Sequence, residues 1–208
     1  LKEVDEICYE EGVLVFSDEI HADLTLPPYK HRPFAMVSEK ARMNCVTFMS
    51  PSKAFNMPGL TASHALIFNP KLRRKFHAYL ESCELDLGHV FAFLAIEAAY
   101  THGTEWLDQC LAYIQGNIDY VDEFLKLHTP KIKAIRPQAS FLVWLDCREM
   151  GLAQDALNDF FVDKAHLALN NGVAFGEEGE GFMRLNVASP RSVLEKAMKQ
   201  LADAYAAL

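Results

Sequence analysis

Short apolar runs rich in β-branched and aromatic residues recur in the first seventy residues, and each ends abruptly at polar residues or at Asn-Pro. These runs are Val13–Phe16, Cys45–Met49 and His64–Phe68. A continuous apolar run of this length is typical of a strand buried on both faces, as in a parallel sheet covered by helices. Longer helical patterns follow at Lys71–Glu81, His89–His102 and Glu105–His128. This order predicts an α/β sheet in the first part of the chain.

A different arrangement is expected after Pro130, which ends the long helical region. Strand-like and helical segments follow at Ile132–Arg136, Phe141–Asp146, Ala153–His166 (helical), Leu167–Phe175, Gly181–Val187 and Ser192–Ala207 (helical). Such a mixture favours a smaller α+β domain. We therefore expect one domain at residues 1–105 and a second at 106–208, with the long helices of residues 89–128 bridging the two.

The charge and cysteine content exclude several classes of function. The 208 residues include 20 Lys and Arg against 28 Asp and Glu, for a net charge of -8. An acidic chain without a basic cluster lacks the electrostatic footprint of a nucleic-acid or membrane-surface protein. The cysteine count is odd and no pair has C-x-x-C spacing, so neither a zinc site nor a disulfide framework is expected. We expect most of the five to be buried and reduced (Cys8, Cys45, Cys83, Cys110 and Cys147).

The chain begins inside a helical pattern. Leu1, Val4 and Ile7 lie on one helical face, and Gly12 is placed to end the helix, yet no initiator Met precedes it. We expect the chain to be the C-terminal part of a longer protein. No signal peptide or membrane-spanning segment is visible, which favours the cytoplasm, although a targeting signal on the missing part would be invisible.

Candidate chemistry lies where the first two strands end. Asp18 follows the first strand, and Ser50, Ser52 and Lys53 follow the second. Ligands bind outside the carboxyl ends of strands in open α/β sheets. A carboxylate there suits a cationic group, and hydroxyls beside a lysine suit a phosphate and a carbonyl. Taken singly, Asp18 is better explained as a helix-capping or turn aspartate, and Lys53 as a solvated loop lysine.

Three segments resemble motifs of the fold-type I enzymes that depend on pyridoxal 5'-phosphate (PLP). Ser17–Asp23 resembles the segment that holds the cofactor's pyridine nitrogen. Ser50–Leu60 resembles the segment of the cofactor-binding lysine, and Gly176–Asn186 the segment with a substrate-carboxylate arginine. Their order and spacing are similar to those of the cystathionine β-lyase-like branch of the class I and II aminotransferases, and the resemblance covers essentially the whole chain.

The resemblance implies a role for each matching residue. Lys53 would carry PLP covalently and then shuttle protons at the substrate Cα. Asp18 would keep the ring nitrogen protonated, which makes the ring an electron sink. Ser50 and Ser52 would bind the phosphate, and Arg184 would bind the substrate α-carboxylate through a bidentate pair.

Two positions depart from the broader aminotransferase pattern. His21 stands where many relatives have a tyrosine bonded to the cofactor's phenolate oxygen, and it is equally well explained as a structural histidine. Thr61 stands where many aminotransferases have a phosphate-binding arginine. Both departures are familiar in the β-lyase-like branch and favour it.

The resemblance implies an aspartate aminotransferase-like fold. Residues 1–105 would be the C-terminal part of the PLP-binding large domain, and 106–208 the complete small domain. The implied activity is carbon–sulfur β-elimination from a sulfur amino acid such as cystathionine or cysteine, in a homodimer that holds PLP and no catalytic metal. The alternatives are an aminotransferase and a non-catalytic binding or regulatory module that kept the fold.

Overall fold

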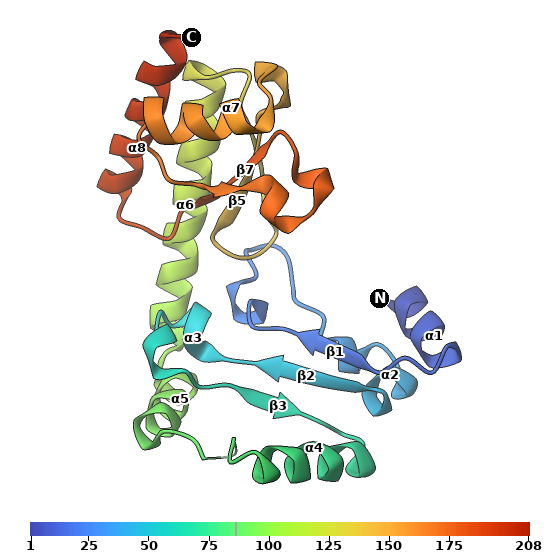
Figure 1. The fold of residues 1–208 in the computed structure, drawn as a ribbon. Helices are drawn as coiled ribbons and strands as arrows, with labels where there is room; N and C mark the ends of the chain where they lie inside the picture. The colour runs from blue at the N-terminus through green and yellow to red at the C-terminus, as the bar shows by residue number, and fades with distance from the viewer. Residues whose placement is uncertain (86) are drawn as a thin grey trace. The chain divides into compact units, whose positions relative to one another are not determined.

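A computed structural model describes residues 1–85 and 87–208 (Figure 1). Its contacts divide the chain into two compact units, residues 1–109 and 110–208. The helix α6, Thr104–His128, is continuous across the division. Among the described residues, no helix combines the length and the apolar character needed to cross a membrane.

The first unit is built on a three-stranded sheet in the order β1-β2-β3. Its strands are β1 (Val15–Asp18), β2 (Cys45–Met49) and β3 (His64–Leu66), and its helices are α1 (Lys2–Glu10), α2 (Glu39–Met43), α3 (Pro51–Ala54), α4 (Pro70–Ser82) and α5 (Val90–His102). Short 3-10 turns lie at η1 (Ala22–Leu24), η2 (Phe34–Met36) and η3 (Pro58–Leu60). β1 runs parallel to β2, with Asp18 opposite Phe48, so both strands end at the same edge of the sheet. β3 is antiparallel to β2.

The burial of the sheet differs from strand to strand. Cys45 and Val46 of β2 are fully buried, whereas β1 alternates and its Phe16 is 66% exposed. The expectation that the first strand is buried on both faces is therefore wrong in this structure, because among the described residues β1 lies at an edge of the sheet and pairs with β2 alone. The expectation for the cysteines also fails in part. All five are free thiols, but only Cys45 and Cys147 are buried, and Cys83 is exposed.

The second unit contains a four-stranded antiparallel sheet in the order β4-β5-β7-β6. Its elements after α6 are β4 (Lys133–Ile135), β5 (Leu142–Asp146), η4 (Arg148–Met150), α7 (Gln154–Asp159), the π-helical turn η5 (Phe160–Lys164), β6 (Asn170–Asn171), η6 (Gly172–Phe175), η7 (Glu177–Gly179), β7 (Phe182–Asn186) and α8 (Arg191–Ala206). Val143, Leu145, Met183 and Leu185 point into the core from one face of this sheet. The helices α6, α7 and α8 supply the other side of that core (Figure 1).

One predicted strand of the second unit is mostly absent. Of Leu167–Phe175, only Asn170–Asn171 is a strand, and Gly172–Phe175 forms a 3-10 turn. The reason is a close backbone approach, because a Cβ built on Gly172 would lie 2.1 Å from the carbonyl oxygen of Gly179. The chain can make this approach only with glycine at both positions.

Asn117 of α6 joins three parts of the second unit. It is fully buried, and its Nδ2 donates to the carbonyl oxygens of Val187 at 2.9 Å and Ser189 at 3.0 Å. Its Oδ1 accepts from Nε of Arg191 at 2.9 Å. The side chain thereby satisfies backbone groups in the turn between β7 and α8 that would otherwise be buried without partners.

Candidate active site

The ends of β1 and β2 bring the first group of predicted residues together. Asp18 is the last residue of β1, and Ser50 follows β2 directly. The helix α3 contacts the turn η1, so the segments that continue from the two strands meet beyond the sheet edge. The Asp18 carboxylate is exposed and accepts one hydrogen bond, from the backbone N–H of Ile20 at 3.2 Å. His21 lies between β1 and η1 and is half-buried.

Ser50 and Ser52 form a pair of hydroxyl groups at the start of α3. Ser50 caps the helix by accepting from the backbone N–H of Ser52 at 3.1 Å, and the two Oγ atoms are 2.7 Å apart. The Ser50 Oγ also lies 2.5 Å from the carbonyl oxygen of Ala62. A hydroxyl has a single hydrogen, and a carbonyl can only accept. When Ser50 donates to Ala62, the hydrogen of a bond between the two hydroxyls must therefore come from Ser52.

Lys53 presents an unpaired amine beside these hydroxyls. Its side chain is exposed in the last turn of α3, and the described residues offer it neither an ion pair nor a hydrogen bond. Thr61 lies next to Ala62 and has a left-handed backbone with φ of 44°. A β-branched residue adopts this conformation at a cost in strain. The bond from Ser50 to Ala62 keeps this strained turn beside α3.

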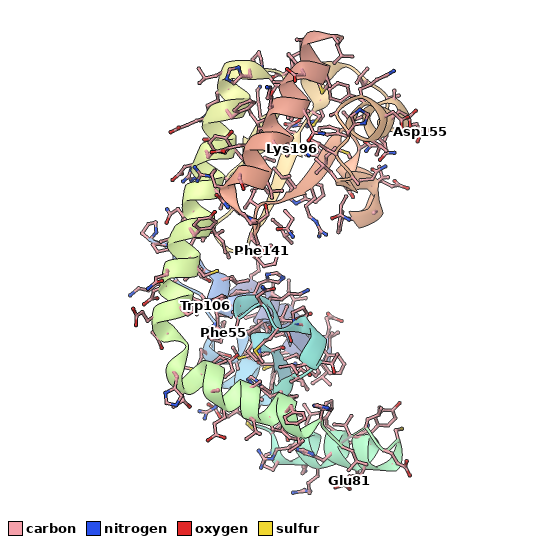
Figure 2. The ribbon with its side chains drawn as sticks, turned by 90° about the vertical axis from the view of Figure 1, so that its left-hand side faces the viewer. Phe55, Glu81, Trp106, Phe141, Asp155 and Lys196 are labelled. Atoms are coloured by element: carbon pink, nitrogen blue, oxygen red, sulfur yellow. The ribbon has the colours of Figure 1, made fainter. Side chains whose placement is uncertain are left out.

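A layer of aromatic rings follows Lys53 in the first unit. Phe55 stacks on Trp106 with the ring centres 6.0 Å apart and meets Tyr100 edge-on at 5.8 Å. Figure 2 shows Phe55 and Trp106 side by side. The Tyr100 hydroxyl donates to Asp23 at 3.3 Å. Partial burial, followed by the negative charge of Asp23, raises the pKa of Tyr100 to about 12, so its hydroxyl stays protonated near neutral pH.

Glu19 is a buried carboxylate that the motifs did not single out. Its side chain is 4% exposed and accepts hydrogen bonds from Ser17 Oγ at 2.9 Å and from the backbone N–H of Phe34 at 3.0 Å. Nε2 of His31 lies 2.7 Å from its other oxygen. Glu19 thus ties the loop of residues 25–37 to the end of β1. Its partners are 12 and 15 residues away in a segment without periodicity, which left no local signal to find.

Arg184 lies in the second unit, in the middle of β7. Its Nη2 donates to Oδ1 of Asn170 at 3.0 Å, and its guanidinium lies over the ring of Phe175 at 4.4 Å. Its Nε is buried without a hydrogen-bond partner, and the described residues place no carboxylate within ion-pair distance. A half-buried arginine without a counter-charge can receive a carboxylate from outside the chain.

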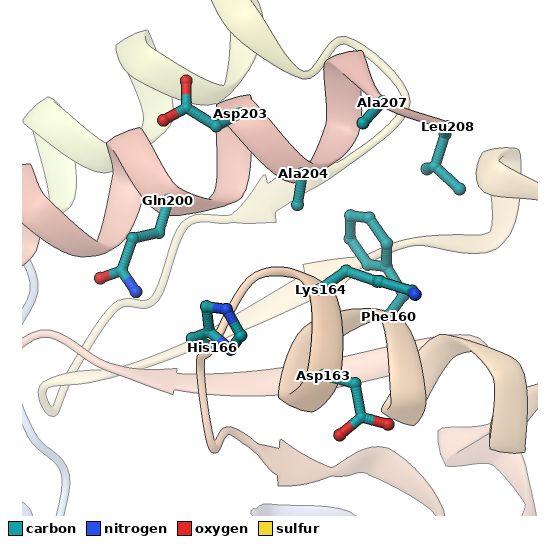
Figure 3. A pocket seen from close by; sticks show the side chains of 9 residues that line it. All are labelled: Phe160, Asp163, Lys164, His166, Gln200, Asp203, Ala204, Ala207 and Leu208. Carbon is teal, nitrogen blue, oxygen red and sulfur yellow. The ribbon is translucent and has the colours of Figure 1, made fainter.

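The larger cavities lie elsewhere. One of about 460 Å³ in the second unit is lined by η5 and α8, with Lys164, His166 and Asp203 at its wall (Figure 3). Another, of about 550 Å³, lies beside His31 and Met36 in the first unit. Neither is lined by a predicted site residue. Among the described residues, no group of three or more His, Cys, Asp or Glu side chains could hold a metal ion.

The model of one protein family, aminotransferase class I and II, matches residues 1–201. The chain belongs to this family. It is 41% identical to cystathionine β-lyase PatB of Bacillus subtilis over 201 residues, which cover 97% of this chain and 52% of that protein. It is 35% identical to protein MalY of Escherichia coli over 204 residues, which cover 98% of this chain and 52% of that protein.

A solved structure also has this fold. Cystalysin from Treponema denticola, which contains a PLP cofactor, matches with a TM-score of 0.95 and 31% identity over 99% of this chain and 52% of its own. The resemblance and the fold predicted from the sequence are confirmed. The chain spans about half the length of the curated relatives it matches.

Proposed function

We propose that this chain is the C-terminal part of a PLP-dependent carbon–sulfur β-lyase that acts on a sulfur amino acid of the cystathionine or cysteine type. The observation that carries the proposal is the shared sheet edge at which β1 ends in Asp18 and β2 is followed by Ser50, Ser52 and Lys53. The similarity to PatB, which is named a cystathionine β-lyase, supports the lyase activity over aminotransfer.

The residues at this edge fit the chemical groups of PLP. The cofactor has a phosphate, an aldehyde and a ring nitrogen, and when bound it supplies an electron sink for the substrate Cα. The Ser52 hydroxyl can donate to the phosphate while Ser50, which donates to Ala62 and accepts from the Ser52 backbone N–H, holds the start of α3 in place. The unpaired Lys53 amine suits the aldehyde, and the exposed Asp18 carboxylate suits a protonated ring nitrogen. His21 is the candidate donor to the phenolate oxygen.

Lys53 then acts as the base. It removes the proton from the substrate Cα, the bond from Cβ to sulfur breaks, and the sulfur leaves with the electron pair as a thiolate. Addition of water completes the balance, since cystathionine and water give homocysteine, pyruvate and ammonia. Arg184 binds the α-carboxylate of the amino acid, because its donors lack a counter-charge.

The proposal includes the organisation of the whole protein. Residues 1–105 are assigned to the C-terminal part of the PLP-binding large domain and 106–208 to the small domain, with the helices of residues 89–128 bridging them. We propose a cytoplasmic homodimer whose substrate is a small amino acid, and no role for nucleic acid, membrane or metal.

Two other functions use the same residues differently. An aminotransferase would use Lys53 to move the Cα proton without breaking a bond at Cβ, and Asp18 would serve it equally. A non-catalytic module that kept the fold would have no need of Lys53, Asp18 and Arg184 together. The presence of all three favours an enzyme.

The test uses the complete protein that contains this chain. Incubation with L-cystathionine and no 2-oxo acid is expected to release pyruvate and a free thiol over many turnovers. Turnover that requires a 2-oxo acid and releases no thiol would establish the aminotransferase instead. A preparation with no PLP absorbance band would support the non-catalytic module.

A second experiment tests the anchor. Borohydride reduction of the holoenzyme followed by peptide mapping is expected to place the cofactor on Lys53. The variant Lys53→Ala should lose turnover, whereas Lys71→Ala, which removes an exposed lysine on α4, should not. A cofactor tag on another lysine would show that the assignment is wrong.

A further inference from the structure

Trp144 is flanked by two phenylalanines, and each of these lies under an arginine. The ring of Phe175 meets Trp144 edge-on with centres 5.4 Å apart, and the ring of Phe182 does so at 5.9 Å. Arg184 lies over Phe175 at 4.4 Å, and Arg148 lies over Phe182 at 4.8 Å. The two phenylalanine rings make matching contacts, but the two arginines differ in whether a carboxylate of the chain already pairs with them.

Arg148 already has its counter-charge. Its Nε and Nη2 bond the carboxylate of Asp146 at 2.9 and 2.7 Å, and its side chain is 64% exposed. Arg184 instead bonds the neutral amide of Asn170 through Nη2. The described residues leave its Nε and Nη1 without a hydrogen-bond partner. Of the two arginines, only Arg184 is held in place with its charge still available.

The two contacts of Arg184 fix its orientation in complementary ways. Stacking on Phe175 sets the plane of the guanidinium and uses none of the N–H donors, because these point outward in that plane. The bond to Asn170 sets the rotation within the plane. Asn170 stands directly opposite Arg184 in the β6–β7 pairing, and Trp144 stands opposite it in the β5–β7 pairing. The arginine is therefore ordered before a ligand arrives.

The backbone places Phe175 over this part of the sheet. Phe175 ends the 3-10 turn η6, whose Gly172 packs against Gly179 too closely for a side chain. The next residue, Gly176, has φ of 131°, which residues with a side chain rarely adopt. The interruption of the predicted strand is thus what brings the ring to Trp144 and Arg184.

We propose that Phe175 and Asn170 are positioning residues that hold Arg184 ready for the substrate α-carboxylate. The inference rests on the proposed role of Arg184. An arginine that is already ordered loses less conformational freedom when a carboxylate binds, so the benefit falls on substrate affinity. Removing the ring should therefore raise the KM for the amino acid and leave kcat and PLP binding almost unchanged.

The experiment compares matched variants of the complete holoenzyme, in whichever of the two activities it shows. Phe175→Leu is expected to raise KM about 5- to 10-fold with kcat within about twofold, the range that loss of a cation–π contact predicts. Phe175→Tyr keeps the ring and should keep KM. Phe182→Leu removes the matched ring under Arg148 and should leave KM unchanged. Asn170→Ala, which leaves the aromatic cluster intact, is expected to raise KM as well.

The variant Arg184→Ala tests the proposed binding of the α-carboxylate by Arg184 separately from the positioning of Arg184 by Phe175 and Asn170. If Arg184→Ala raises KM strongly but Phe175→Leu and Asn170→Ala behave like Phe182→Leu, the positioning inference is wrong and the role of Arg184 stands. If Arg184→Ala leaves KM unchanged, both are wrong. Equal PLP absorbance in all variants confirms that the cofactor site is intact, and Asn170→Ala decides the question if Phe175→Leu fails to fold.

Discussion

Replacing Glu19 with leucine should loosen the loop of residues 25–37 while the rest of the first unit stays folded. The substitution keeps the approximate volume and removes every acceptor that Glu19 provides. The backbone N–H of Phe34 is then left buried without a partner, because Phe34 is 5% exposed. Ser17 and the partly exposed His31 can turn to water instead.

The expected cost follows from these contacts. A buried donor left without a partner costs about 1–3 kcal/mol, and each of the two other bonds contributes about 0.5–1.5 kcal/mol. Relief from burying a carboxylate offsets part of this sum. A net loss of about 2–3 kcal/mol in the local opening free energy is expected, and this corresponds to amide exchange that is about 30- to 150-fold faster.

Hydrogen exchange followed by mass spectrometry on peptides that cover residues 31–37 measures this change directly. Glu19→Gln keeps an oxygen for Ser17 and Phe34, so it should show a much smaller effect. Glu39→Leu serves as the control, because Glu39 is exposed and its contact with Arg42 is 3.8 Å long. Unchanged exchange in Glu19→Leu, or equal exchange in the leucine and glutamine variants, would refute the reasoning.

Three further predictions concern two buried side chains, Asn117 and Cys147, and the partly exposed Tyr100. Asn117→Ala should destabilise the second unit by about 3 kcal/mol, because three hydrogen bonds are lost, and the unfolding midpoint in urea should fall. Cys147, whose pKa is raised to about 12 mainly by burial, should resist alkylation until the protein unfolds. Tyr100 has a pKa of about 12 in the folded protein against 10.0 for the free side chain, so the folded state holds this proton more tightly. Its contribution to stability should be complete below pH 10 and lost as the pH rises to about 12, and tyrosinate absorbance should show its late titration.

A specific result would contradict each of these three predictions. A urea midpoint of Asn117→Ala equal to that of Glu123→Ala, a change at an exposed position of α6 in the same unit, would contradict the hydrogen-bond account. Rapid alkylation of Cys147 in the folded protein would show that it is not sequestered. A stability that does not fall between pH 10 and 12 in the parent, or that falls equally in Tyr100→Phe, would remove Tyr100 from the pH dependence.

The sequence predicts local structure well where neighbouring residues determine it. β2 has the predicted bounds because Cys45–Met49 is a continuous apolar run that ends at Ser50 and Pro51. Leu167–Phe175 is apolar at both ends but contains Asn170, Asn171 and Gly172, and most of it is not a strand, because Gly172 contacts Gly179 from beyond the segment. The pattern of one segment does not record such a contact.

The candidate site shows the same difference between features set by neighbouring residues and features set by distant contacts. Asp18, Ser50 and Lys53 could be placed at neighbouring strand ends because a parallel pairing was predicted, and β1 and β2 have that pairing. The contacts of Glu19 and Arg184 could not be predicted. They depend on His31, Phe34 and Phe175, whose positions are set by turns between elements.

The two tryptophans of the chain, Trp106 and Trp144, lie in different compact units. Trp106 stacks on Phe55, and Trp144 lies between Phe175 and Phe182. Each unit therefore contains one tryptophan, whose emission can be excited selectively over that of the tyrosines. A variant with phenylalanine at either tryptophan makes emission specific to the other unit, so the unfolding of each can be followed without an attached dye. The emission of Trp144 would also report movements of the ring that holds Arg184.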